Sequence, residues 1–159
     1  MNIYLIRHGK AEGFSRYKED SERELLAEGK EELYKAAHYW KKVIHEFDLI
    51  ISSNFTRALQ TAEIIKEVFK YEKELLIEPY LAKGGSVSRL IETTYSFPKK
   101  NIAFVGHEPT LSKYVSQLTS GSGVNIDFKK GMIAKISFPH KAREGNGTLD
   151  FIIPVSFFK

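Results

Sequence analysis

The feature that most limits how this chain can fold is its first nine residues. Residues 3–6 form a short apolar run of isoleucine, tyrosine and leucine, which is typical of a strand buried on both faces of a sheet. The run ends at once in Arg7, His8 and Gly9. Open α/β sheets bind ligands at the edge where their parallel strands end. The stretch therefore predicts a strand that delivers an arginine and a histidine to a ligand site, with Gly9 allowing a sharp turn or a close approach of the backbone.

Further runs of similar design follow along the chain. One of them leads directly into His107, and a helix that includes Arg57 follows another. The predicted strands after the first are residues 48–53, 75–77, 101–106, 132–138 and 148–153, the last two as an antiparallel pair around a Gly-Asn-Gly turn.

Apolar side chains at three- and four-residue spacing predict helices between these strands. The first helix carries its stripe over residues 33–47. It is expected to begin between Ser21 and Gly29, because Ser21 and Glu24 match a capping box that Gly29 opposes. Two later helices are predicted to start after Ser86 and around Pro109.

The second helix matters most for function because it positions Arg57. Its stripe covers residues 58–69, and Ser53 or Asn54 is predicted to cap it. Arg57 then lies in the first turn, where its side chain points back toward the strand end. We expect it close to His8 if the two strands are neighbours.

Strands that alternate with helices imply an α/β fold with a mostly parallel sheet, covered by helices on both faces. The final strand pair predicts an antiparallel edge. A chain of 159 residues is most simply one domain, so residues 1–159 are expected to form a single unit. Residues 10–21 are polar and predict an irregular loop over the mouth of the site.

The composition narrows the chemistry and the surroundings. The sequence has no cysteine, which excludes disulfides, thiolate metal sites and a cysteine nucleophile. The net charge of +4 comes from interleaved lysine and glutamate without a basic block, so a nucleic-acid partner is not expected. The first apolar run is too short for a signal peptide, and nothing approaches the ~20 apolar residues of a membrane span. We therefore expect a cytoplasmic protein that does not bind membranes.

Two arginines and two histidines near strand ends suit a phosphoryl group. Arginine stays charged and binds phosphate oxygens bidentately. Arg7, Arg57 and a protonated His107 would neutralise the phosphoryl charge without a metal. His8, kept neutral by the nearby arginines, could attack phosphorus and form a phosphohistidine intermediate. A backbone carbonyl is expected to hold its other ring nitrogen and fix the tautomer.

These motifs together resemble those of the histidine phosphatase superfamily. Arg-His-Gly at the end of the first strand and Ser-x-x-x-Arg-Ala-x-Gln-Thr at the second helix are specific when they occur together. Within the superfamily the chain is most similar to the small SixA-type phosphohistidine phosphatases. The resembling segments are residues 7–9, 23–29, 53–61, 106–109, 128–134 and 145–148.

The resemblance implies a three-layer α/β/α sandwich without a cofactor or a metal. It implies that His8 is the phosphorylated nucleophile. Arg7, Arg57 and His107 would form the phosphate clamp and bind the substrate.

One departure from the family concerns the proton donor. Larger members carry an acidic residue in a Leu-x-x-x-Gly region, where this chain has Lys83. No general acid is therefore assigned. Glu12, Glu78 and Glu108 are candidates, and each is more simply explained as a structural or solvated residue.

The missing acid bears on the substrate. An alkoxide leaves poorly without a proton, whereas the free ring nitrogen of phosphohistidine can hold one, with an imidazole pKa of about 6.5. A short chain also predicts a shallow, open pocket, which suits a phosphorylated side chain on a protein. The expected partner is a phosphohistidine-bearing protein, such as a histidine phosphotransfer domain, and the product is inorganic phosphate.

Three alternatives stay open at this point. The first is a broad-specificity small-molecule phosphomonoesterase that uses the same nucleophile. The second is a catalytically weak module that binds phospho-ligands. The third is a metal hydrolase built on His8 and His107, for which the sequence offers no obvious third ligand.

Overall fold

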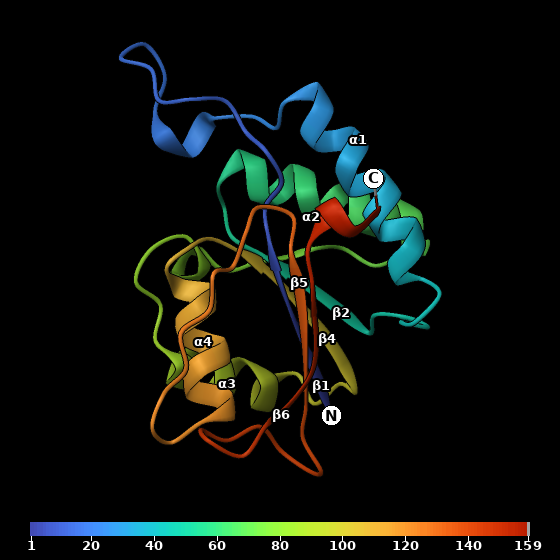
Figure 1. Ribbon diagram of the computed structural model, residues 1–159, viewed down its shortest axis with the longest axis vertical. Helices are drawn as coiled ribbons and strands as arrows, with labels where there is room; N and C mark the ends of the chain where they lie inside the picture. Colours follow the sequence, from blue (N-terminus) through green and yellow to red (C-terminus); the bar gives the residue numbers. More distant parts are fainter. Residues whose placement is uncertain (159) are drawn as a thin grey trace.

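The chain folds around a six-stranded sheet with the strand order β3-β2-β4-β1-β5-β6. The computed structural model describes residues 1–158 (Figure 1). The strands are β1 (Asn2–Arg7), β2 (Leu49–Ser52), β3 (Leu76–Ile77), β4 (Asn101–Gly106), β5 (Ile133–Ser137) and β6 (Thr148–Ile153). The helices are α1 (Ala27–Trp40), α2 (Thr56–Phe69), α3 (Val87–Ser96) and α4 (Thr110–Thr119), with short 3-10 turns η1 (Asp20–Glu22), η2 (Pro79–Leu81) and η3 (Val155–Phe158). None of the described helices is long and apolar enough to cross a bilayer.

The sheet is mostly parallel, as the alternation of elements predicted. β1 pairs in parallel with β4, β4 with β2, and β2 with β3. β5 runs antiparallel to β1, and β6 runs antiparallel to β5. Helices α1 and α2 lie on one side of the sheet and α3 and α4 on the other (Figure 1). The predicted three-layer α/β/α sandwich with an antiparallel edge is thus confirmed.

The first strand is central because both of its faces are covered. Tyr4 and Ile6 belong to the core under α1 and α2, whereas Ile3 and Leu5 belong to the core under α3 and α4. All four side chains are almost completely buried. Burying such a side chain contributes roughly 1.5–3 kcal/mol. The continuous apolar run therefore holds the strand, and the residues after it, in a fixed place.

Helix α1 is shorter than its apolar stripe predicted. The helix ends at Trp40, although Ile44 and Phe47 continue the spacing and are buried in the same core. Ile44 still donates its N–H to the Trp40 carbonyl at 2.7 Å, which closes a last turn beyond the helix. The spacing identified the core residues correctly and the helix end wrongly.

No side chain caps the start of α1, and a glycine in its first turn packs against the chain beyond His8. The helix begins at Ala27 without a side-chain cap, so the box predicted from Ser21 and Glu24 does not start it. A Cβ at Gly29 would lie 2.4 Å from the Lys10 carbonyl oxygen. Gly29 therefore lets the chain that follows His8 pack directly against the helix backbone.

Candidate active site at the carboxyl edge of the sheet

His8 emerges at the end of β1 and is only 5% exposed. Its Nδ1 lies 2.8 Å from the Gly9 carbonyl oxygen. Because that oxygen can only accept, Nδ1 carries the proton and Nε2 keeps its lone pair. Burial, together with the positive charges of Arg57, Arg7 and Lys130, lowers the pKa of His8 to about 3, although the Gly9 contact opposes this shift. The ring is therefore neutral near pH 7, with Nε2 available as a nucleophile.

Gly9 is required by close packing behind this ring. A Cβ there would lie 2.6 Å from Leu33 Cδ1 in α1. The Gly9 N–H donates to Thr61 Oγ1 at 3.3 Å, and the Thr61 hydroxyl donates to the Arg57 carbonyl at 2.8 Å. The backbone beside His8 is thereby joined to both α1 and α2.

Arg57 reaches His8 although their strands are not adjacent. Strand β4 lies between β1 and β2, so the condition on which the sequence-based expectation depended is not met. From the first turn of α2, the Arg57 Nε–H nevertheless donates to His8 Nε2 at 3.2 Å. The side chain is 6% exposed. Burial lowers the pKa of this guanidinium and the carboxylate of Asp20 raises it, and arginine stays charged in either case.

His107 follows β4 and stands beside His8, with ring centroids 4.9 Å apart and an interplanar angle of 51°. Burial, together with the proximity of His8 and Arg57, lowers its pKa to about 3. The ring is therefore neutral in the ligand-free site. Protonation of His107 beside a bound phosphoryl group, whose negative charge would favour the imidazolium, stays a prediction.

Ser53 holds His107 and does not cap α2. The residue at the cap position is Phe55, and no side chain caps this helix. Ser53 Oγ accepts the Phe55 N–H at 3.1 Å and lies 2.7 Å from His107 Nε2. The hydroxyl can donate its proton to Nε2 while it accepts the Phe55 N–H, if the His107 proton is on Nδ1. His107 Nδ1, which is buried and has no partner among residues 1–158, is then an N–H donor available to a ligand.

Arg7 approaches the same site from the end of β1. Its Nη1–H donates to the Phe128 carbonyl at 2.6 Å, while its buried Nε has no partner within the described chain. Its charge acts on both His8 and His107, lowering their pKa values. The four residues singled out in the sequence thus lie within electrostatic range of one another, and His8 directly contacts Arg57.

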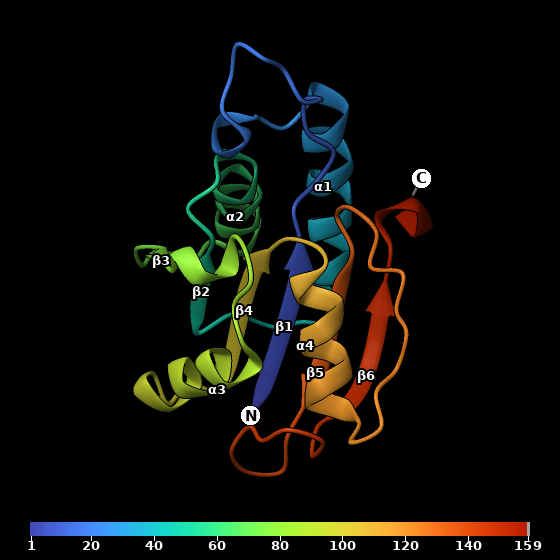
Figure 2. The same ribbon diagram turned by 90° about the vertical axis from the view of Figure 1, so that its left-hand side faces the viewer.

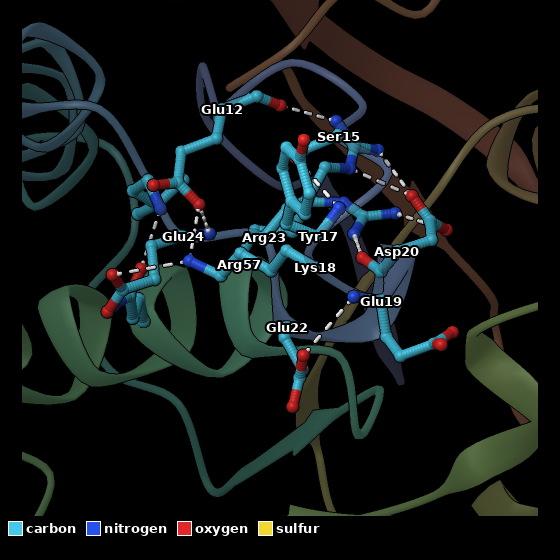
Figure 3. A network of polar contacts seen from close by, with 12 residues as sticks. Glu12, Ser15, Tyr17, Lys18, Glu19, Asp20, Glu22, Arg23, Glu24 and Arg57 are labelled. Carbon is cyan, nitrogen blue, oxygen red and sulfur yellow. Dashed lines mark hydrogen bonds and ion pairs between the residues drawn. The ribbon is translucent and has the colours of Figure 1, made fainter.

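Asp20 is the site residue that sequence reasoning missed. Its carbonyl oxygen accepts from Arg57 Nη1 at 2.6 Å, and its Oδ2 lies 3.4 Å from Arg57 Nη2 (Figure 3). Arg23 holds the other carboxylate oxygen through Nε at 2.8 Å and Nη2 at 2.7 Å. Burial raises the pKa of Asp20, but the bonds from Arg23 and the charge of Arg57 outweigh it and lower the pKa overall. The carboxylate is ionised at neutral pH and is not a proton donor.

Two of the three candidate proton donors are engaged elsewhere. The Glu12 carboxylate pairs with Lys18 at 2.6 Å, and the Glu108 carboxylate accepts from the backbone and the hydroxyl of Ser112 at 2.9 and 2.8 Å. Within residues 1–158, no group of three histidine, cysteine or acidic side chains lies close enough together to hold a metal ion.

Comparison with known proteins agrees with this geometry. The model of the histidine phosphatase superfamily (branch 1) matches residues 3–82, which is half of the chain. A phosphohistidine phosphatase SixA homolog of Haemophilus influenzae is 28% identical over 147 residues, covering 86% of this chain and 87% of that protein.

Solved structures share the whole fold. The structure of the protein histidine phosphatase SixA complexed with tungstate has a TM-score of 0.86 at 23% identity and covers 100% of both chains. The putative phosphohistidine phosphatase SixA from Agrobacterium tumefaciens has a TM-score of 0.81 at 20% identity, covering 96% of this chain and 97% of that one. The family match, which covers half of the chain and includes His8 and Arg57, shows that the chain belongs to the histidine phosphatase superfamily.

Proposed function

We propose that this phosphatase removes the phosphoryl group from phosphohistidine in a partner protein, with His8 as the nucleophile. The observation that carries the proposal is the contact between His8 Nδ1 and the Gly9 carbonyl at 2.8 Å. It leaves the Nε2 lone pair on the side of the ring where the Arg57 Nε–H lies, 3.2 Å away. A phosphoryl group held by arginines would meet a neutral, correctly oriented imidazole there.

The first step is an in-line transfer. His8 Nε2 forms a bond to phosphorus while the P–N bond to the substrate imidazole breaks, and the electron pair of that bond stays on the departing nitrogen. If the second nitrogen of the substrate ring is protonated, the imidazole leaves neutral. A separate acid is then unnecessary, which agrees with an ionised Asp20 and an engaged Glu12.

The second step returns the enzyme to its starting state. A water oxygen attacks phosphorus, the P–N bond to His8 breaks, and phosphate leaves after the water has lost a proton to solvent or to the phosphate. Throughout, Nδ1–H donates to the Gly9 carbonyl. Arg7, Arg57 and the Nδ1–H of His107 would bind the non-bridging oxygens and stabilise their charge.

Transfer between two imidazoles also suits the energetics of this site. The bond that forms on His8 and the bond that breaks on the substrate are both P–N bonds to an imidazole. Neither the substrate imidazole in the first step nor His8 in the second therefore needs strong activation as a leaving group. A sugar phosphate would instead release an alkoxide, which needs a proton, whereas Glu12 and Glu108 are engaged elsewhere and Asp20 is ionised. The rival activity of a small-molecule phosphomonoesterase is thus less well supported.

A trapping experiment tests the proposal. A histidine phosphotransfer domain, labelled with radioactive phosphate by its kinase, is mixed with the enzyme and quenched in alkali on the millisecond scale. We expect acid-labile label on His8, followed by free phosphate, and no label on His8→Ala. Label on another residue, or faster hydrolysis of sugar phosphates than of the phosphoprotein, would contradict the proposal. Tight phosphate binding without any phosphoenzyme would favour the binding module.

A further inference from the structure

A loop whose two ends are joined by backbone contacts lies above the carboxyl edge of the sheet. Residues 12–23, here called the strap, leave the sheet after His8 and return to α1. Its two ends lie side by side, because Ala11 bridges Leu25 and the Glu12 N–H donates to the Glu24 carbonyl at 2.9 Å. Figure 2 shows the strap rising beyond the edge at which β1 ends.

The strap carries two large side chains that the fold leaves in water. Phe14 is 83% exposed and Tyr17 is 86% exposed, the highest values among the large apolar side chains described. Aromatic residues are enriched in protein interfaces, where burying them contributes much of the binding energy. Two such residues on one short loop therefore mark a surface for a partner.

A chain of contacts connects Phe14 to the site. The Arg23 guanidinium lies 4.2 Å from the centre of the Phe14 ring. The same guanidinium binds the Asp20 carboxylate, and Asp20 in turn accepts from Arg57. Phe14 thus projects from a network of contacts that reaches Arg57, which contacts His8. Figure 3 shows Arg23, Asp20 and Arg57 in this network, with Tyr17 on the same loop. A loop held in this way loses little entropy when it binds.

Positive charges around the site indicate what the partner carries. Lys83 is 76% exposed beside Phe55, with its Nζ 5.8 Å from that ring and 3.9 Å from Asp20 Oδ2. Arg16, on the strap, and Lys130 make no ion pair with the residues that the structure describes. Lys130 lines a recess of about 500 Å³ beside Arg7. Glu28 and Glu32 also line this recess, but Lys130 lies within the combined positive field of Arg7, Arg23, Arg57 and Lys10. This side of the rim complements a surface that presents acidic side chains near a phosphoryl group.

We infer that Phe14 and Tyr17 form a docking surface for the protein that carries the phosphorylated residue. The inference depends on the proposed function and adds the way in which the substrate is selected. The partner is a folded protein with an apolar patch and carboxylates next to its phosphohistidine. The aromatic side chains contribute to binding this protein, and a small phosphorylated molecule held at His8 does not need them.

The test compares two substrates on the double variant Phe14→Ser/Tyr17→Ser. The probes are a phosphorylated histidine phosphotransfer domain and phenyl phosphate. We expect kcat/KM for the phosphoprotein to fall at least tenfold, mainly through KM, while kcat/KM for phenyl phosphate stays within twofold. The single variant Tyr17→Ser, which leaves the contact between Phe14 and Arg23 intact, should show an intermediate loss.

Val43→Ser is the matched control. Val43 is 63% exposed and lies between α1 and β2, at the opposite edge of the sheet. It should leave both substrates unaffected. Equal losses for both substrates in the double variant would show that the aromatic residues only support the strap. No loss for either substrate would remove the docking role while leaving the proposed function intact. A wild-type enzyme that hydrolyses only phenyl phosphate would overturn both.

Discussion

The Arg57 Nε lies 3.2 Å from His8 Nε2, although an entire strand separates β1 from β2. The gap is bridged because Arg57 stands in the first turn of α2 and has a long side chain. The intervening strand is β4, which leads directly into His107. The sheet order thus brings His107 beside His8, with ring centroids 4.9 Å apart, and three separate chain segments meet at one site.

Replacing Arg57 should weaken the chemical step. Arg57→Ala removes a guanidinium that contacts His8 and would bind the phosphoryl oxygens, so kcat should fall by about 10²–10³-fold. Arg57→Lys keeps the charge without the planar fork and should recover only part of the loss. Steady-state kinetics on phenyl phosphate measures both. Wild-type kcat in Arg57→Ala would exclude a role in transition-state stabilisation.

Ser53→Ala should impair His107 without disturbing the fold. The variant removes the hydroxyl that lies 2.7 Å from His107 Nε2, and losing one buried hydrogen bond of about 1–1.5 kcal/mol would lower kcat roughly tenfold. Ser52→Ala is the control, because Ser52 is equally buried but donates to the Ser53 carbonyl. Similar kinetics in the two variants would show that the His107 contact is unimportant for turnover.

Acid should destabilise the protein through its two buried histidines. The folded-state pKa values of His8 and His107 are lowered to about 3, whereas an unfolded histidine titrates near about 6.5. Between these values the unfolded chain binds more protons, so stability is complete above about pH 6.5 and falls by up to about 1.4 kcal/mol per pH unit for each group as the pH drops.

Urea unfolding at about pH 7 and about pH 5 measures this effect. His8→Gln should lose less stability between the two pH values than the wild type does. The exposed His140 provides the control, and His140→Gln should behave like the wild type. An unchanged pH dependence in His8→Gln would mean that His8 is not held neutral by the fold.

Asp20 should compete with phosphate for Arg57. Its Oδ2 lies 3.4 Å from Arg57 Nη2, so Asp20→Asn removes a negative charge next to the anion site. Inhibition by inorganic phosphate should tighten about fivefold, corresponding to a partly screened interaction of ~1 kcal/mol. Glu22→Gln, in the same 3-10 turn, should have little effect. Weaker phosphate inhibition in Asp20→Asn would show that Asp20 mainly positions the guanidinium.

Local patterns predicted those parts of the fold whose residues form continuous or periodic apolar runs. β1 and β4 were predictable because each is apolar along its length. Ser86 was predictable as a cap because a serine precedes an apolar helical stripe, and it does accept the Arg89 N–H at 3.2 Å. The end of α1 was not predictable, because Ile44 keeps the helical spacing of apolar residues although it lies in a turn beyond the helix. The position of β4 between β1 and β2 is set by packing over the whole sheet, which no single segment encodes.

The candidate site was predictable where strand ends carry unusual side chains, as with His8 and His107. Asp20 gave no such signal because it lies in a polar loop without periodicity, and its importance arises only when the strap meets Arg57. Ser53 gave a misleading signal. A serine before a helix usually caps it, whereas the Ser53 hydroxyl contacts His107, which follows a different strand.

The close approach of Lys10 to Gly29 has a consequence for engineering this enzyme. Replacing a glycine inside a helix by alanine commonly strengthens a protein by about 0.4–1 kcal/mol, so Gly29 would rank high among sites for thermostabilisation. Here the added methyl group would meet a carbonyl oxygen at 2.4 Å and push away the backbone just beyond His8. Strengthening the helix at this position would disturb the backbone two residues beyond His8, so stabilising substitutions should leave Gly29 unchanged.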